Sequence, residues 1–310
     1  MSEAPSIDEA AGPGRLQAWF EACRSYSLTA SVTPLLVGAA MAVRAGFFAP
    51  FRLLAALAGA LAIHIGTNLI NDYYDHVKGA DSLDSLGGSK VIQRGLLTAD
   101  EVWWGGMACL GAGSLAGLAL SYACGWPILV IGLPSVAAGY FYTAPPFALA
   151  YNALGELAVF IFMGPAIVLG SYFVMALELG WAPLVASLPV GFLVTAILHA
   201  NNVRDIETDP RYRKTTLANL FGRRAAAAEM ALLCAAAYLT TAGAVVAGVL
   251  PWTVLATALT LPHAWAALRP VLSESTPAAL DRAVLGSARL HLEFGLLLAG
   301  SILAAGALKL

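Results

Sequence analysis

Long runs of apolar residues recur along almost the whole chain, and they limit its fold more than any other feature of the sequence. Of the 310 residues, 59% are hydrophobic and only 12% are charged, whereas soluble domains usually carry about 25% charged residues. A helix of about 17 to 25 apolar residues crosses the hydrocarbon core of a bilayer. Because such runs leave no room for a sizeable soluble domain, the sequence predicts an all-α polytopic membrane protein.

We predict about nine membrane-spanning helices from length and hydropathy. They cover residues 28–45, 51–73, 103–123, 126–143, 154–177, 181–202, 226–248, 251–270 and 285–308. Residues 1–24 then form a cytoplasmic N-terminal segment, and residues 25–310 form a single transmembrane domain. Two long loops, at about 74–102 and 203–225, are expected to cap that domain.

The distribution of Lys and Arg predicts the orientation in the membrane. If the N-terminus is cytoplasmic, only Arg44, Arg52 and Lys309 of the 17 basic residues lie on the far side. That bias is the positive-inside pattern, and it places both long loops in the cytoplasm and the C-terminus outside. The first residues lack the basic region and cleavage site of a signal peptide, so we expect no cleavage.

Charge and cysteine content exclude two other classes of site. The net charge of −2 gives no overall basic signal for nucleic acid. The four cysteines show no spacing typical of a metal site, so we expect free thiols. They are Cys23, Cys109, Cys124 and Cys234.

Acidic residues at the end of the second predicted span indicate a functional site. An ionised Asp near the hydrocarbon core costs roughly 2.5 to 3.5 kcal/mol, so acids in this position need an explanation. On a helix, Asn68, Asp72 and Asp75 fall at i, i+4 and i+7, with Asn71 beside them, and therefore project from one face. Asp81 follows beyond Gly79 and belongs either to the same site or to the solvated loop.

A second cluster, at the end of the sixth predicted span, has the same pattern. Asn201, Asp205 and Asp209 fall at i, i+4 and i+8 on a helix. Carboxylate and amide oxygens suit a hard cation such as Mg²⁺, which proteins hold with few carboxylates plus substrate phosphates. His76 and His199 lie nearby, but we expect structural roles for both, because a histidine at a membrane interface is more often hydrogen-bonded than catalytic.

Basic residues are interleaved with the acids of both clusters. Lys78 and Arg94 follow the first cluster, while Arg204 and Lys214 accompany the second. Carboxylate, metal ion and basic side chain together suit the binding of a diphosphate. Because the cluster lies at the mouth of an apolar bundle, the attached group is expected to be an isoprenoid. Its departure would leave an allylic cation that an aromatic face can stabilise.

Several stretches of the sequence resemble the UbiA superfamily of intramembrane prenyltransferases. Residues 68–81 and 201–209 resemble the two aspartate-rich motifs of that superfamily. Residues 88–97, 142–147 and 154–156 further resemble the branch that prenylates 1,4-dihydroxy-2-naphthoate in menaquinone synthesis. The resemblance implies nine helices around a central cavity, with Mg²⁺-dependent transfer of a polyprenyl group from its diphosphate to an aromatic ring and loss of the ring carboxylate.

The resemblance also implies roles for individual residues. The metal ligands would be Asn68, Asp72, Asp75, Asp81, Asp205 and Asp209. The substrate contacts would come from Asn68, Asn71, Lys78, Arg94, Asn201, Arg204 and Lys214, and Tyr142 would lie near the developing cation. The partners implied are a polyprenyl diphosphate, a small aromatic acceptor and the bilayer of a bacterial cytoplasmic membrane, with neither nucleic acid nor an obligate protein partner.

The sequence departs from this branch at positions that bear on the acceptor. Ala148 and Asn152 stand where basic residues are common, Arg213 replaces a frequent Gly, and Ser25 replaces a frequent Pro. Another quinone, haem or chlorin precursor therefore stays open as the acceptor. A cation-coupled transporter is the alternative from another class, but it would place its acids near the bilayer midplane.

Overall fold

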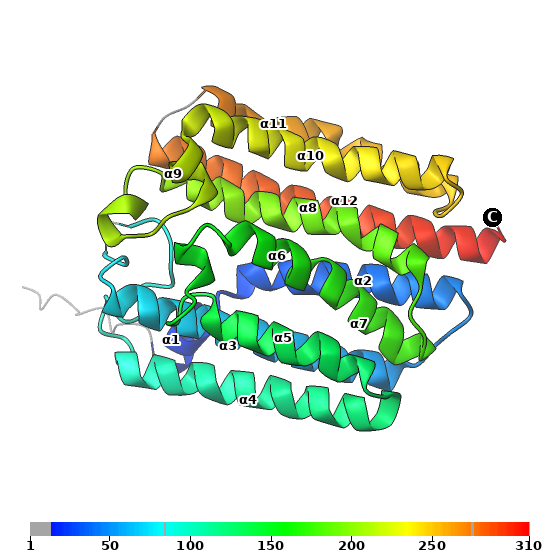
Figure 1. Cartoon of the computed structure of the whole chain (residues 1–310), viewed down its shortest axis with the longest axis horizontal. Helices are drawn as coiled ribbons and strands as arrows, with labels where there is room; N and C mark the ends of the chain where they lie inside the picture. The colour runs from blue at the N-terminus through cyan, green and yellow to red at the C-terminus, as the bar shows by residue number, and fades with distance from the viewer. Residues whose placement is uncertain (1–13, 84, 274–275, 310) are drawn as a thin grey trace, which may run out of the picture.

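The computed structural model describes residues 14–83, 85–273 and 276–309, and these residues form a bundle of helices (Figure 1). The α-helices are α1 (Arg15–Ala22), α2 (Thr29–Arg44), α3 (Pro50–Val77), α4 (Ala99–Cys124), α5 (Pro127–Phe141), α6 (Gly155–Met163), α7 (Pro165–Ala176), α8 (Trp181–Arg204), α9 (Leu217–Phe221), α10 (Arg223–Val246), α11 (Leu261–Ser273) and α12 (Pro277–Leu308). Short 3-10 helices occur at η1 (Ser25–Leu28), η2 (Leu149–Tyr151), η3 (Asp209–Tyr212) and η4 (Trp252–Thr260).

Within the described residues, seven helical segments are long and apolar enough to cross a membrane. They are Arg15–Arg44, Pro50–Val77, Ala99–Cys124, Gly155–Ala176, Trp181–Arg204, Arg223–Val246 and Pro277–Leu308. The span predicted at 126–143 is the 15-residue helix α5, and the span predicted at 251–270 is η4 followed by α11. The all-helical membrane fold is thus confirmed, whereas the count of nine spans stays a prediction.

The span predicted at 154–177 is two helices rather than one. Helix α6 ends at Met163, and Pro165 begins α7. Proline has no N–H for the helical hydrogen bond, so it belongs at a helix start. A Cβ on Gly164 would lie 2.7 Å from the Cα of Gly191 in α8, so only glycine permits this close approach.

Helices α3 and α4 pack closely through small residues. A Cβ on Gly66 of α3 would lie 3.0 Å from the carbonyl oxygen of Gly106, and one on Gly113 of α4 would lie 3.0 Å from that of Gly59. Small residues let transmembrane helices approach one another in the absence of a hydrophobic driving force. The packing of α3 against α4 therefore fixes the part of α3 that precedes the first acidic cluster.

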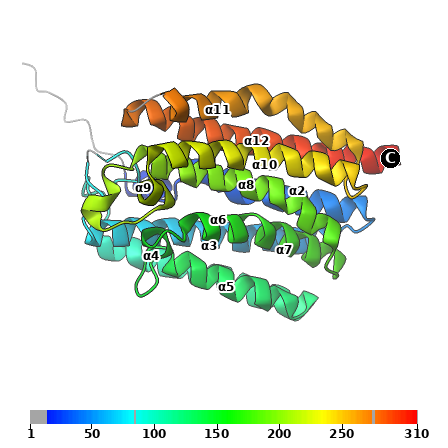
Figure 2. The same ribbon diagram turned by 45° about the horizontal axis from the view of Figure 1, so that its top comes forward.

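Both loops that follow the acidic clusters lie at the same end of the bundle. The segment after α3 and the segment from Asp205 to α9 are on the left in Figures 1 and 2, and the C-terminal end of α12 is on the right. Helices α8 and α12 supply much of the core, where Leu193, Phe294 and Ile302 are fully buried. Because both loops lie at this end, the two acidic clusters lie at the same end of the bundle.

Candidate active site

A cavity of about 950 Å³ connects the two acidic clusters with the apolar interior. Its polar end is lined by Asn68, Asn71, Asp75, Asp81, Asn201, Arg204, Asp205, Asp209 and Lys214. Its other end is lined by apolar side chains that include Ile63, Phe162 and Val174. The cavity can therefore take a charged head at the mouth and an apolar tail between the helices.

The first cluster lies on one helix, as predicted, but its members point to different partners. Helix α3 continues to Val77, so it carries Asn68, Asp72 and Asp75. Asp72 is buried and does not line the cavity. One of its oxygens accepts from Arg24, and the other accepts from the Ser89 hydroxyl at 2.5 Å and the Ser89 backbone N–H at 3.3 Å.

Sequence reasoning did not select Arg24, Ser89 or His64 for this site. Arg24 lies just before η1 with a φ of 48°, a left-handed conformation that directs the chain back toward α3. His64 lies on α3 and lines the cavity, and its Nδ1 lies within hydrogen-bond distance, 2.8 Å, of the Ser31 hydroxyl oxygen. Only the loop motif around Ser89 carried a sequence signal, because the two other residues depend on contacts between distant segments.

Asp81 returns to the site although it lies beyond the end of α3. Gly79 has a φ of 72°, and the loop it begins brings the Asp81 carboxylate to the cavity. Lys90 Nζ donates to Asp81 Oδ1 at 3.1 Å. The other oxygen, Oδ2, is buried and has no hydrogen-bond partner. Asp81 therefore lies in a loop and its side chain lines the cavity, while its role as a metal ligand stays a prediction.

The second cluster is not on a continuous helix, so that part of the prediction is wrong. Helix α8 ends at Arg204, and Asp209 begins the 3-10 helix η3. Pro210 has no N–H to donate to Ile206, which disfavours further α-helix. A turn nevertheless preserves the spacing, because the Asp209 N–H donates to the Asp205 carbonyl at 2.9 Å. Asp205 and Asp209 both line the cavity.

The two basic residues of the second cluster are bound to its acids. Arg204 donates from Nε and Nη2 to Asp205 at 2.9 and 2.8 Å, and from Nη1 to Asp281 of α12 at 2.7 Å. Lys214 Nζ lies 3.2 Å from Asp209 Oδ1. Burial lowers the pKa of Lys214, but the nearby carboxylates, Asp209 first, outweigh it and raise that pKa overall. Both side chains are therefore held as cations at the mouth of the cavity.

Burial changes the pKa of Asp209, the acid beside Lys214, in the other direction. It raises the pKa of Asp209 to about 6, although the charge of Lys214 lowers it in part. Asp209 Oδ2 is buried without a hydrogen-bond partner. The ionised form of this carboxylate is therefore incompletely stabilised by the protein alone.

Tyr151 links the first cluster to the segment before α6. Its hydroxyl donates to Asp75 Oδ1 at 2.6 Å, and Lys78 Nζ lies 3.4 Å from the centre of its ring. Lys78 also donates to the Thr143 carbonyl at 2.8 Å. Burial raises the pKa of Tyr151, and the Asp75 charge raises it further, so the hydroxyl stays protonated as a donor. Sequence reasoning missed Tyr151, whose position depends on the folding of the 142–154 segment.

The remaining predicted residues divide into two groups. Tyr142 and Asn201 line the cavity. Lys78 and Arg94 do not, and Arg94 is paired with Glu21 at 2.6 Å on a partly exposed part of the surface. Ala148 and Asn152 also lie outside the cavity lining, and Asn152 donates to the Phe147 carbonyl at 2.7 Å within its own loop.

The donor set of the cavity mouth fits a hard divalent cation. Among the described residues that line the cavity, four side-chain oxygens are buried without a hydrogen-bond partner: Asn71 Oδ1, Asp81 Oδ2, Thr143 Oγ1 and Asp209 Oδ2. Leaving a buried acceptor unsatisfied costs about 1 to 3 kcal/mol, so several together indicate a missing partner. Mg²⁺ and Ca²⁺ take carboxylate and amide oxygens, and Mg²⁺ keeps room for water and phosphate oxygens.

The helical fold and the paired acidic clusters at the mouth of an apolar cavity define a class of membrane enzymes. The chain belongs to the UbiA prenyltransferase family, and its match to this family covers residues 31–306. It is 33% identical over 291 residues to the 1,4-dihydroxy-2-naphthoate octaprenyltransferase of Bacillus subtilis (strain 168), covering 93% of this chain and 92% of that protein. It is 35% identical over 204 residues to the enzyme of the same name from Mycobacterium tuberculosis, covering 66% and 70% of the two chains.

Solved structures of the family share the fold at low sequence identity. An apo UbiA homologue from Aeropyrum pernix K1 is 15% identical with a TM-score of 0.67, covering 88% of this chain and 97% of that one. A homologue from Archaeoglobus fulgidus bound to GPP and Mg²⁺ is 17% identical with a TM-score of 0.66, covering 91% and 99%. The bundle described above is therefore the fold of this family.

Proposed function

We propose that this prenyltransferase moves a polyprenyl group from an allylic diphosphate to 1,4-dihydroxy-2-naphthoate, the aromatic acceptor of menaquinone synthesis. The observation that carries the proposal is the convergence of two acidic clusters on one cavity that is polar at its mouth and apolar within. The naphthoate acceptor is supported by the names of relatives that are aligned over most of this chain.

The diphosphate would bind at the cavity mouth together with Mg²⁺. The unpartnered oxygens of Asn71, Asp81 and Asp209 support this placement, and Asp75 and Asp205 line the same region. Bound Mg²⁺ would neutralise diphosphate oxygens and so stabilise the leaving group. Asn68 lines the cavity as well, and its amide nitrogen donates to the Ser27 hydroxyl at 3.1 Å, so a metal contact would come from Oδ1. Asp72 would join the set only when Arg24 releases it.

The protein's own cations would complete the diphosphate site. Lys214 and Arg204 line the mouth, each paired with one carboxylate of the second cluster. Lys78 lies over the ring of Tyr151 and outside the cavity lining, so its charge would act on the diphosphate without direct contact. Arg94 would reach the diphosphate only by leaving Glu21. Positioned cations of this kind stabilise the charge that develops on a departing phosphate group.

The chemical steps follow from the proposed donor and acceptor. The allylic C–O bond breaks and its electron pair leaves with the diphosphate. A ring carbon of the acceptor bonds to the allylic carbon, and the ring carboxylate departs as CO₂ and returns its electron pair to the ring. Tyr142 lines the cavity and would present its ring to the developing cation. Water exclusion by the apolar lining would protect that cation from hydrolysis.

The protein is an integral membrane protein, and we propose that the cavity mouth faces the cytoplasm. The positive-inside bias supports this orientation, as does the position of both acidic loops at the end of the bundle opposite the C-terminal end of α12. Diphosphate and Mg²⁺ would then enter from the cytoplasm. Residues 25–310 would act as one domain, with the loops at 74–102 and 203–225 as its cap.

An assay of the purified chain with one allylic diphosphate and a panel of aromatic acceptors tests the proposal. Product masses should show prenylation of 1,4-dihydroxy-2-naphthoate with loss of the mass of CO₂, and only when Mg²⁺ is present. Prenylation of a different acceptor alone would reject the naphthoate and keep the reaction class. No transfer to any acceptor from several allylic donors would reject the class as well.

A further inference from the structure

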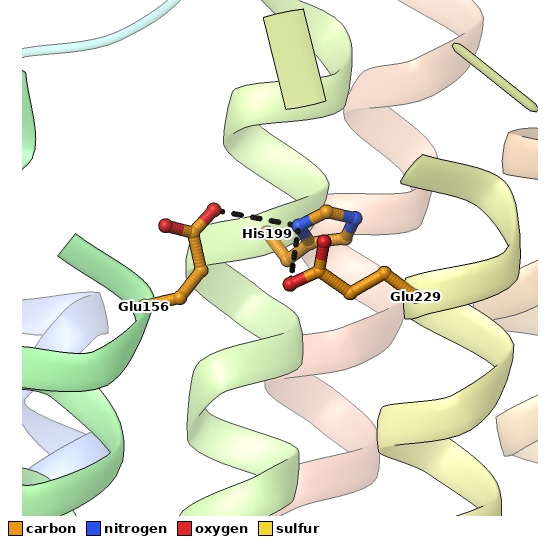
Figure 3. Close-up of side chains that lie close together, drawn as sticks. All are labelled: Glu156, His199 and Glu229. Carbon is orange, nitrogen blue, oxygen red and sulfur yellow. Dashed lines mark hydrogen bonds and ion pairs between the residues drawn. The ribbon is translucent and has the colours of Figure 1, made fainter. Parts of the chain in front are cut away.

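Three titratable side chains converge inside the bundle, away from the cavity lining. They are Glu156 of α6, His199 of α8 and Glu229 of α10, which face one another in Figure 3. One ligand-type atom from each lies within 4.8 Å of the two others. Glu156 and His199 are buried, and the Glu229 side chain is 25% exposed. Three separate helices thus direct one imidazole and two carboxylates to a common point.

Hydrogen bonding fixes the orientation of the imidazole. His199 Nε2 lies 2.8 Å from the backbone carbonyl oxygen of Ala226. A carbonyl oxygen can only accept, so Nε2 carries the proton and donates it. In a neutral imidazole, the other nitrogen, Nδ1, then offers a lone pair to whatever lies between it and the carboxylates. Histidines that bind metal ions commonly use their second nitrogen in this way, donating to a backbone carbonyl.

The distances around Nδ1 are long for direct hydrogen bonds. Nδ1 lies 3.4 Å from Glu156 Oε1 and 3.7 Å from Glu229 Oε1, whereas N–H···O bonds are usually about 2.7 to 3.2 Å long. Ligand atoms bound to a tetrahedral ion at about 2.0 to 2.1 Å lie roughly 3.4 Å from one another. The observed separations therefore match ligands around an ion better than a hydrogen-bonded pair.

Glu156 Oε1, the oxygen that lies 3.4 Å from His199 Nδ1, also accepts a hydrogen bond. The Asn202 amide donates to Glu156 Oε1 at 2.7 Å. Asn202 directly follows Asn201 of the second acidic cluster, so the three side chains are connected to the end of α8, just before Asp205. Two carboxylates and a neutral imidazole together carry two negative charges in a region of low dielectric, and a divalent ion would neutralise them.

We propose that Glu156, His199 and Glu229 bind a divalent transition-metal ion of the zinc class, with water completing its coordination. A nitrogen ligand with two carboxylates suits Zn²⁺, whereas Mg²⁺ prefers oxygen ligands alone. None of the three residues lines the diphosphate cavity, although Asn202, which donates to Glu156, does, and the site does not depend on the proposed reaction. Its role would be to join α6, α8 and α10 behind the second acidic cluster.

Metal analysis of the full-length protein tests this site directly. The chain would be purified in detergent, loaded with Zn²⁺ and dialysed against Mg²⁺-containing buffer freed of transition metals. Mass spectrometry of the metal content should find about one Zn²⁺ per chain. Titration with Co²⁺ in place of Zn²⁺ should give a visible absorption band that saturates at the same ratio.

Variants assign the ion to these side chains. His199→Gln and Glu229→Gln should each lose most of the retained Zn²⁺ and the Co²⁺ band, whereas Asp209→Asn, altered in the diphosphate cavity, should keep both. Because Glu229 is partly exposed, Glu229→Gln is expected to fold. If His199→Gln does not fold, the comparison of Glu229→Gln with the unaltered protein tests the site. Absence of bound Zn²⁺ and of the Co²⁺ band in the unaltered protein would overturn the proposal and leave a proton between the three side chains. Retention of both by the two variants would also overturn it.

Discussion

Asp209 is an acid of the cavity mouth whose ionised form the protein stabilises incompletely. Its pKa is raised to about 6 by burial, and one of its oxygens has no partner. Asp209→Asn removes the charge with little change in size. We expect the Mg²⁺-dependent rate of prenyl transfer to fall by about 10- to 100-fold, the usual cost of losing a group that supports a metal ion.

Glu207 provides the matched control on the same loop. Its side chain is 81% exposed and lies 3.5 Å from Arg223. Glu207→Gln should retain the rate of the unaltered protein when both variants insert to the same level in membranes. Equal rates for Asp209→Asn and Glu207→Gln would show that Asp209 has no role in the reaction.

Tyr151 is the residue that sequence reasoning missed and that has the sharpest single test. Tyr151→Phe keeps the ring beneath Lys78 but deletes the hydroxyl that donates to Asp75. A hydrogen bond to a charged group contributes about 1.5 to 3 kcal/mol, so we expect the rate at low diphosphate concentration to fall by roughly 10- to 100-fold. Tyr122→Phe is the control, because Tyr122 is 97% exposed on α4. An unchanged rate in Tyr151→Phe would show that Asp75 needs no such donor.

At the scale of helices, the contact between α2 and α7 depends on one glycine. A Cβ on Gly38 would lie 2.3 Å from the backbone carbonyl oxygen of Val168 and 2.0 Å from the Ser171 hydroxyl. Because the carbonyl belongs to the backbone, the helices themselves would have to separate. Gly38→Ala should therefore destabilise the protein by about 1 to 3 kcal/mol, the usual cost of overpacking.

Thermal unfolding in detergent measures that cost, with Gly111→Ala as the matched control. Gly111 is also within a helix, and a Cβ there meets nothing within 4 Å. Gly38→Ala should unfold at a clearly lower temperature than the unaltered protein, and Gly111→Ala should not. If the two variants unfold together, α2 and α7 are not in close contact at this point.

Helix periodicity was the part of the site that sequence could predict. Asn68 and Asp75 lie on one face of α3 because the helix continues to Val77, as their spacing required. The pairing of Asp72 with Arg24 could not be predicted, since it depends on a left-handed turn 48 residues away in the chain. The predicted span at 181–202 agrees with the end of α8 at Arg204, but the helical spacing assumed as far as Asp209 was wrong, although Pro210 gave a local signal against it.

At the scale of the whole molecule, composition was enough to predict a polytopic helical bundle but not the form of each span. Hydropathy cannot distinguish a continuous helix from α6 and α7, which meet at Gly164 against α8. Nor can it distinguish an α-helix from η4, because both bury similar apolar side chains. The cavity depended on these irregularities and on the loops, so its lining was only partly predictable from sequence.

The two acidic clusters, far apart in the chain, are proposed to form a single Mg²⁺-dependent diphosphate site. Calorimetric binding of an unreactive prenyl thiolodiphosphate to the purified protein tests it most directly. Binding should require Mg²⁺ and should be lost in both Asp75→Asn and Asp209→Asn, one variant from each cluster. Full binding in either variant, or binding that is the same without Mg²⁺, would contradict the account.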